Sequence, residues 1–341
     1  MNVILRVSQD WLAEVTSAWN GFWFTPAQPH TLALLRIFAG AMILYTHIVW
    51  SLDLNSFLGP NSWVTTDLSL EIHRTMETPT AWSYLWYVES PVVLWVLHIL
   101  ALIVFVLLTI GLWSRVVSVL ACIITLSYCH RLNGSWFGLD QINAMLVMYL
   151  VVGPCGAVYS LDHWLEERKT RSTITPSGSV SGNVAIRLIQ LHLSVIYLFG
   201  GIAKLRGESW WDGSATWFSV SNFEYQSLDM TWIGHYPYLF ALLTHVTVFW
   251  ETFYCALVWP RLTRPVVLLI AVGVHGGIAL FLGMITFGLA MLIANLAFVS
   301  PTLVQASVNW VSKSWARGGQ GSSAFKQPEP IKSKPKRNGP K

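Results

Sequence analysis

A lysine near the end of a long apolar segment is the residue of this sequence best placed to do chemistry. Lys204 closes the run Tyr197-Leu-Phe-Gly-Gly-Ile-Ala-Lys204, and Gln190, Tyr197 and Lys204 are spaced seven residues apart. At about 100° per residue, this spacing puts the three side chains on one narrow stripe of a helix. Apolar surroundings favour the neutral amine of a lysine, which can accept a proton. The stripe therefore indicates either a base or, as for many helix-end lysines, an ammonium that extends to the lipid headgroups.

Glycines and tryptophans surround this lysine along the chain. Gly200 and Gly201 lie one turn before it, where missing side chains allow either a second helix or a flat ligand to approach closely. The segment after it contains Trp210, Trp211 and Asp212, of which the tryptophans are typical of a membrane interface and the aspartate is within reach as a carboxylate partner. Together with Tyr197, these five residues are our predicted ligand-binding set.

Three further polar residues stand inside apolar segments. His275 is followed by Gly276 and Gly277, which leave room for a ligand, so we predict it as a second catalytic residue; the alternative is a histidine bonded to a neighbouring carbonyl. Arg36 and Glu251 are the charges deepest in the apolar segments, and their depths are comparable by rise per residue. A charge at that depth is costly unless it is paired, so we predict a structural ion pair between them.

The composition shows which elements must position these residues. Hydrophobic residues make up 54% of the chain and charged residues only 11%, which excludes a water-soluble domain and indicates an integral membrane protein. A spanning helix takes about 20 residues. The fold class predicted is an all-α bundle of about eight transmembrane helices, with an N-terminal amphipathic helix over 9–24 in the membrane interface. The segments are 31–51, 90–110, 115–130, 141–160, 184–203, 237–259, 265–282 and 285–304.

Three regions follow from this pattern: an interfacial segment over 1–30, a transmembrane domain over 31–305 with a flexible connector at 170–183, and a basic, disordered tail over 306–341. Lys and Arg gather in the loops on one side and acidic residues on the other, so both termini are expected in the cytoplasm and Lys204 at the outer face of the cell membrane. The tail is expected to contact anionic lipid and not nucleic acid, because no aromatic residues interleave its charges.

The cysteines do not form a metal or disulfide motif. All four lie in apolar segments and none is part of a C-x-x-C pair, so we predict no metal site. They are Cys122, Cys129, Cys155 and Cys255.

Several of these segments resemble one known family. The run Phe199-Gly-Gly-Ile-Ala-Lys204-Leu, followed by Trp-Trp-Asp-Gly213, is similar to the lysine-bearing signature of vitamin K-dependent γ-carboxylases and of their bacterial relatives, the HTTM (horizontally transferred transmembrane) domain proteins. Leu34-Leu-Arg36-Ile-Phe, Tyr159-Ser-Leu-Asp162 and the run from His275 to Met291 agree with it. The resemblance covers the chain up to about residue 305.

The resemblance implies a cofactor and a reaction. In the carboxylases a lysine deprotonates reduced vitamin K, oxygen converts the quinol into a strong base, and that base removes the γ-proton of a peptide glutamate before carbon dioxide adds. Lys204 matches the lysine and His275 a family histidine. The family's asparagine-histidine pair is replaced by Trp136-Phe-Gly-Leu-Asp140-Gln-Ile-Asn143, so Asp140 or His275 is expected as the second polar group.

Two classes of function are therefore open. One is a γ-carboxylase-like enzyme that uses reduced vitamin K or a menaquinone-type quinol and acts on a peptide or small molecule at the outer face. The other is a non-enzymatic membrane protein, a transporter subunit or a scaffold, that keeps the family fold. The sequence leaves the oligomeric state and the substrate open.

Overall fold

The protein is mostly helical in the part described by its computed structural model, which comprises residues 2–76, 78, 80–132 and 135–321. Within these ranges the only extended pairing is an isolated bridge between Ala27 and Ser179. The chain divides into one compact unit that ends at Pro301 and a second that begins at Thr302. The all-α prediction is confirmed.

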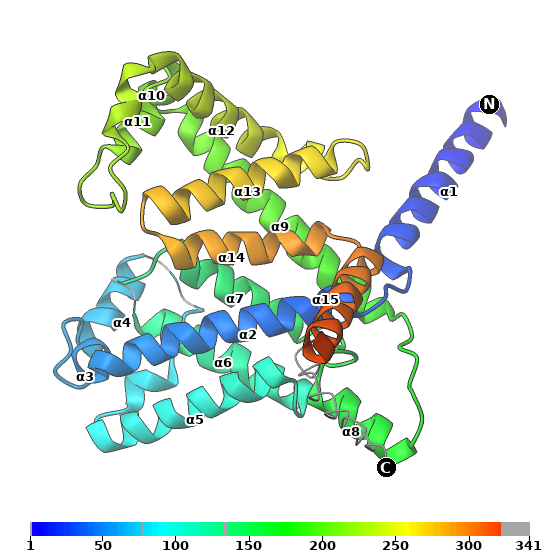
Figure 1. The fold of residues 1–341 in the computed structure, drawn as a ribbon, viewed down its shortest axis with the longest axis horizontal. Coiled ribbons are helices and arrows are strands. Elements are labelled where there is room, and N and C mark those ends of the chain that lie inside the picture. The colour runs from blue at the N-terminus through cyan, green and yellow to red at the C-terminus, as the bar shows by residue number, and fades with distance from the viewer. Residues whose placement is uncertain (1, 77, 79, 133–134, 322–341) are drawn as a thin grey trace, which may run out of the picture. The chain divides into compact units, whose positions relative to one another are not determined.

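Figure 1 shows the helices, which follow one another along the chain in this order: α1 Asn2–Phe24, α2 His30–Trp50, η1 Ser51–Asp53, α3 Leu54–Leu58, α4 Thr66–Thr75, η2 Tyr84–Tyr87, α5 Pro91–Ile110, α6 Ser114–Arg131, α7 Gly138–Leu150, α8 Leu161–Thr170, α9 Val180–Leu205, α10 Glu208–Trp211, α11 Ala215–Val220, η3 Thr231–His235, α12 Pro237–Leu257, α13 Arg264–Phe281, α14 Ile285–Asn295, η4 Leu296–Phe298 and α15 Pro301–Gly321.

Among the described residues, five helices are long and apolar enough to cross a membrane, and the count rises to six if the broken pair Ile285–Phe298 and Pro301–Trp315 makes one span. The five are His30–Leu58, Pro91–Ile110, Val180–Leu205, Pro237–Leu257 and Arg264–Phe281. These helices support a membrane protein, whereas the predicted number of about eight spans is not confirmed.

Two of the three predicted spans that are missing from this set contain a helix that is short or interrupted. The predicted span 141–160 contains only α7, which has 13 residues and is followed by turns around Gly153, Pro154 and Gly156. At 1.5 Å per residue, α7 is about 20 Å long, which is less than the roughly 30 Å of a hydrocarbon core. The predicted span 285–304 is likewise interrupted before Pro301, a residue that has no backbone N–H to continue a helix.

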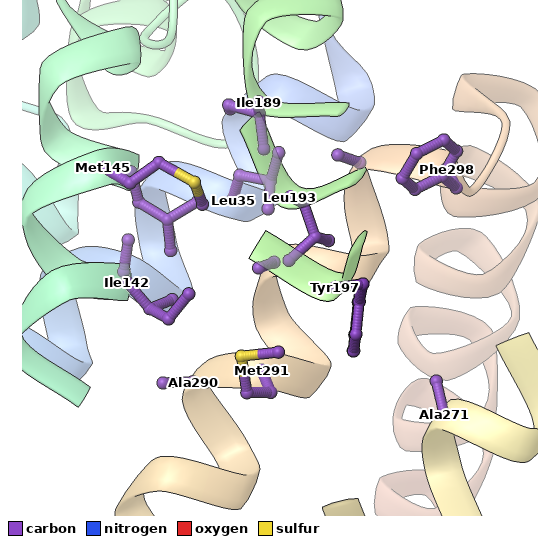
Figure 2. Close-up of a cluster of buried hydrophobic side chains, with 14 of the residues drawn as sticks. Leu35, Ile142, Met145, Ile189, Leu193, Tyr197, Ala271, Ala290, Met291 and Phe298 are labelled. Carbon is purple, nitrogen blue, oxygen red and sulfur yellow. The ribbon is translucent and has the colours of Figure 1, made fainter. Parts of the chain in front are cut away.

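One buried cluster of the first unit is formed mainly by α2, α7, α9, α12, α13 and α14. Figure 1 shows α12 alongside α9 and α13 next to α14. In Figure 2, Tyr197 of α9 lies in one buried cluster with Met291 of α14 and Ala271 of α13. The helices that carry the predicted site residues are therefore packed directly against one another.

Arg36 does not pair with Glu251, so the predicted structural ion pair is wrong. Its guanidinium instead donates to the carbonyl oxygens of Leu108 at 3.0 Å, Thr109 at 3.2 Å and Tyr159 at 2.5 Å. Two of these carbonyls belong to the last turn of α5, where a helix lacks intrahelical partners and its dipole attracts a cation. Backbone carbonyl groups, and not the predicted carboxylate, therefore stabilise the buried positive charge of Arg36.

Asp162 of α8 binds the start of α6, next to the end of α5 that Arg36 contacts. Its carboxylate accepts hydrogen bonds from the backbone N–H groups of Trp113 at 2.7 Å and Ser114 at 2.8 Å, which are the exposed donors at the start of α6. Arg36 and Asp162 both bind the turn between α5 and α6. We refer to these two residues together with that turn as the clasp. At its centre Gly111 adopts a φ of +72°, and a Cβ there would overlap Nη1 of Arg36.

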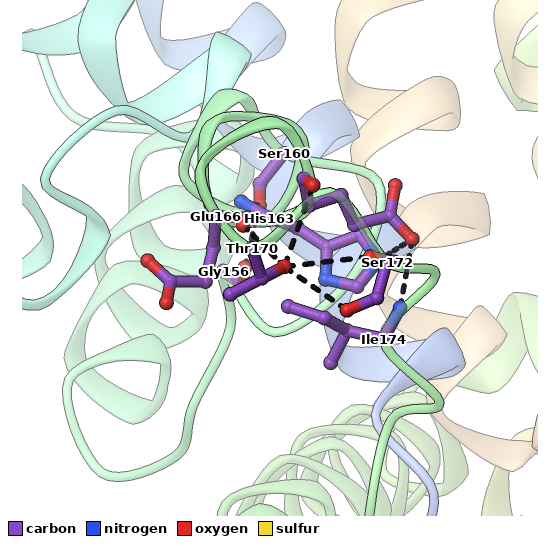
Figure 3. A network of polar contacts seen from close by, with 8 residues as sticks. Gly156, Ser160, His163, Glu166, Thr170, Ser172 and Ile174 are labelled. Carbon is purple, nitrogen blue, oxygen red and sulfur yellow. Dashed lines mark hydrogen bonds and ion pairs between the residues drawn. The ribbon is translucent and has the colours of Figure 1, made fainter.

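The connector after α8 is partly ordered by local hydrogen bonds (Figure 3). Ser160 caps α8 by accepting from the N–H of His163, and Glu167 accepts from the N–H of Ile174 at 3.1 Å. Helix α9 then begins at Val180, capped by Ser179. The predicted connector 170–183 therefore ends earlier than expected, because its last residues are already helical.

Both terminal regions are helical in their described parts, although only the first was predicted to be. Helix α1 includes the predicted helix over 9–24 and exposes Trp11, Leu12, Val15 and Trp19, whereas its amphipathic role at a membrane interface stays a prediction. The tail predicted as disordered from residue 306 is helical as far as Gly321, as part of α15. The remainder of that tail, 322–341, lies outside the described residues.

Candidate functional site

A cavity of about 650 Å³ lies beside the lysine that the sequence singled out. Its walls come from α9, α12, α13 and α14, with the start of α7 and the segment after α9. Most of its lining is apolar, and its ionisable lining residues are Lys204, Glu251, His275 and Tyr197. This combination of an apolar wall and a few polar groups is typical of a small-molecule site, and we call it the Lys204 cavity.

An ion pair stands in the wall of this cavity. Nζ of Lys204 is 2.6 Å from Oε2 of Glu251, and the side chains are 28% and 10% exposed respectively. The ring centroid of Trp210 lies 5.4 Å from the same ammonium nitrogen. Glu251 is thus the carboxylate partner of Lys204, a role that the sequence suggested for Asp212.

Gly201 explains why these two residues meet. A Cβ built at Gly201 would lie 2.5 Å from Oγ1 of Thr252, so only a glycine allows α9 and α12 to approach this closely. The close crossing brings the last turn of α9 against the residue before Thr252, which is Glu251. Gly200 faces the pair itself, since its Cβ would lie 3.4 Å from Oε2 of Glu251.

A second polar group in the cavity is part of a buried hydrogen-bond chain. Tyr254 donates to Oδ1 of Asn295 at 2.7 Å, and Nδ2 of Asn295 donates to the hydroxyl of Tyr197 at 2.9 Å. That hydroxyl lies 2.6 Å from Nε2 of His275. All four side chains are at most 5% exposed, and the chain links α12, α14, α9 and α13. It fixes the orientation of the His275 ring in the cavity wall.

Five of the predicted site residues line the cavity and four do not. The lining residues are Lys204, His275, Tyr197, Gly200 and Trp210. The others are Gly201, Trp211, Asp212 and Asp140, and each of them makes contacts elsewhere.

Local structure accounts for three of these other residues. Trp211 donates through Nε1 to the carbonyl of Leu205 at 2.7 Å. Asp212 accepts from the N–H and the hydroxyl of Ser214, at 2.8 and 2.5 Å, and these bonds lower the pKa of the Asp212 carboxyl. Asp140 accepts from the N–H of Phe137 at 3.3 Å and so caps the first turn of α7. These contacts stabilise turns and helix ends.

Sequence reasoning missed two residues of the site. Glu251 was assigned to Arg36 because the rise per residue gave the two charges comparable depths, although a carboxylate in an apolar segment is itself a signal for a functional site. Asn295 gave a similar signal as an amide in an apolar segment, but its bond to Tyr197 requires the fold. In the part of the chain that the structure describes, no three His, Cys, Asp or Glu side chains gather as a metal site would need.

In comparisons with known proteins, no family model, no curated protein and no solved structure matches this chain.

Proposed function

We propose that this chain is a multi-pass membrane protein that binds a reduced, quinone-type lipid in the Lys204 cavity and removes one of its hydroxyl protons. The ion pair between Lys204 and Glu251 in an otherwise apolar cavity is the observation that carries this proposal. The volume of about 650 Å³ falls in the range of sites for drug-sized ligands. Membership of the HTTM family, with a γ-carboxylase-like reaction, is part of the same proposal and rests on the sequence resemblance.

The residues present fit such a cofactor. Apolar side chains from α12, α13 and α14 suit a lipid ring, and Trp210 with Gly200 gives the ring a flat neighbour and space beside the amine. When bound, a reduced quinone supplies the acidic hydroxyl and, with oxygen, the strong base that the family reaction needs. The remaining proton steps belong to the side chains of this protein.

Lys204 can act as a base only if it first loses its own proton. In the ion pair it is an ammonium, and the carboxylate of Glu251 at 2.6 Å is in place to accept that proton. The neutral amine then takes the proton of the bound hydroxyl at Nζ and becomes an ammonium again. The net result is a protonated Glu251 and an ammonium beside the negative charge left on the ligand oxygen, where it is stabilising.

The alternative function is a non-enzymatic scaffold or transporter subunit, in which the same ion pair only joins α9 to α12. Both functions agree with the observed distance, so they are separated by chemistry. A scaffold tolerates arginine at position 204, because guanidinium also pairs with a carboxylate. A base does not, because guanidinium stays protonated at any working pH.

The test compares Lys204→Ala and Lys204→Arg with the wild type and with Lys169→Ala, a control lysine at the end of α8. Each protein is purified in detergent, its co-extracted lipid is analysed for quinones by mass spectrometry, and oxidation of added menaquinol is followed by chromatography. We expect both position 204 variants to remain folded and to bind quinone, more weakly where the amine is lost, but to lose oxidation by at least about 100-fold, the range of one acid-base catalyst. Full activity of the arginine variant would end the catalytic interpretation.

A further inference from the structure

The hydrogen-bond chain behind the cavity fixes the direction of each of its donors. Nδ2 of Asn295 lies 2.9 Å from the carbonyl oxygen of Met291, and a carbonyl only accepts. This contact identifies the amide nitrogen, so Asn295 donates to the hydroxyl of Tyr197 and accepts from Tyr254 through Oδ1. The orientation of the amide follows from the backbone and requires no assumption about the histidine.

The remaining proton of this chain belongs to the hydroxyl of Tyr197. Its oxygen already accepts from Asn295, and the acceptor at hydrogen-bond distance is Nε2 of His275 at 2.6 Å. Tyr197 therefore donates, and Nε2 is the ring nitrogen without a proton. The ring is neutral, because a second positive charge in this apolar wall beside the Lys204 ammonium would be unfavourable. A neutral imidazole then has its proton on Nδ1.

This Nδ1–H is the donor that the protein leaves unused. Among the described residues it has no hydrogen-bond partner, although the side chain of His275 is only 2% exposed and lines the Lys204 cavity. Buried donors in folded proteins are nearly always satisfied, and an unsatisfied one at a cavity indicates a ligand or a water molecule.

We propose that His275 is a hydrogen-bond donor, and not a base, toward a ligand oxygen in the Lys204 cavity. The inference rests on the proposed function. It gives the site two polar groups that bind the ligand, the Lys204 amine and the Nδ1–H of His275. It selects flat ligands that have two oxygen groups, as a quinone or its quinol has. Tyr197 is a positioning residue, since it acts through the tautomer of His275.

The tautomer is measured directly by magic-angle-spinning NMR of protein labelled with ¹⁵N-histidine, because protonated and bare ring nitrogens have well-separated shifts. The signal of His275 is assigned from its loss in His275→Asn. We expect the Nδ1–H tautomer in the wild type, its partial conversion to Nε2–H in Tyr197→Phe, and no change in Tyr254→Phe, which leaves the contact between Tyr197 and His275 intact. An Nε2–H tautomer or an imidazolium in the wild type would overturn the proposal.

Binding tests the role of the donor with the naphthoquinone menadione as the probe. The amide nitrogen of asparagine is as many bonds from Cα as Nδ1 of histidine, whereas that of glutamine is as many as Nε2. His275→Asn should therefore bind menadione within about twofold of the wild type, and His275→Gln should bind about tenfold more weakly. Equal affinities in both variants would refute the donor role.

The two proposals can fail separately. A wild-type protein that shows the Nδ1–H tautomer but binds neither menadione nor menaquinol refutes the proposed function and the ligand part of this inference, and leaves the donor assignment standing. A protein that binds and oxidises menaquinol but shows the Nε2–H tautomer keeps the proposed function and refutes the inference.

Discussion

Replacing the two members of the Lys204–Glu251 pair, singly and together, tests whether α9 and α12 are joined by this contact. At 2.6 Å and an effective dielectric constant of about 20, the gross attraction is about 6 kcal/mol. Much of that is offset by desolvation of the two groups. For Lys204→Met we expect a loss of about 3 kcal/mol, the low end for breaking a buried pair, because the lysine side chain is 28% exposed.

The second single variant and the double variant complete the cycle. Glu251→Gln should lose only about 1–2 kcal/mol, since the ammonium that remains can extend out of its apolar surroundings. The double variant should lose less than the two single losses added together, by about 1–3 kcal/mol of coupling. The measurement is reversible unfolding in mixed detergent and sodium dodecyl sulfate micelles, followed by tryptophan fluorescence.

The ion pair that the sequence suggested provides a matched control. Arg36 contacts the carbonyls of Leu108, Thr109 and Tyr159 and not Glu251, so the losses from Arg36→Met and Glu251→Gln should add within about 0.5 kcal/mol. Additive losses for Lys204 and Glu251, or strong coupling between Arg36 and Glu251, would show that Glu251 is not the partner of Lys204.

Three other predictions concern the topology, the helix crossing and the clasp. A C-terminal alkaline phosphatase fusion should be inactive and one in the segment 205–235 active, as expected if both termini are cytoplasmic; the reverse pattern contradicts the orientation. Gly201→Ala should destabilise the protein by about 1–3 kcal/mol through overlap with α12, whereas Gly200→Ala, whose nearest contact is 3.4 Å, should change stability by less than about 1 kcal/mol, measured by the same unfolding assay. Gly111→Ala should cost about 2–4 kcal/mol, because it strains a positive φ and displaces the guanidinium of Arg36, and an unchanged midpoint would rule out the clasp as a stabilising element.

The helical class and part of the cavity wall could be predicted from the sequence because they depend on local patterns. The seven-residue spacing placed Tyr197 and Lys204 on the same wall of the cavity. The glycines after His275 suggested a ligand site there, and His275 does line the cavity. In these cases one helix determines which side chains share a face. The same reasoning found Gly200, which faces the Lys204–Glu251 pair.

Pairings between helices could not be read in this way. The partner of Glu251 depends on where α9 and α12 cross, which is set by the contact between Gly201 and Thr252 and not by depth along a span. Arg36 donates to carbonyl groups at the end of α5. Backbone partners of this kind cannot be recognised from the types of side chain in the sequence. The predicted number of spans is not confirmed for a related reason, since hydropathy does not show that the helix α7 ends at Leu150.

The clasp and the Lys204 cavity are made of different residues of the same unit. Arg36, Asp162 and the α5–α6 turn hold one end of the bundle through backbone groups, and none of them lines the cavity. Substitutions that change the lining of the Lys204 cavity therefore leave the contacts of the clasp intact. A sequence with this division of labour can change the lining of its cavity over evolutionary time while the contacts that hold the α5–α6 turn are kept.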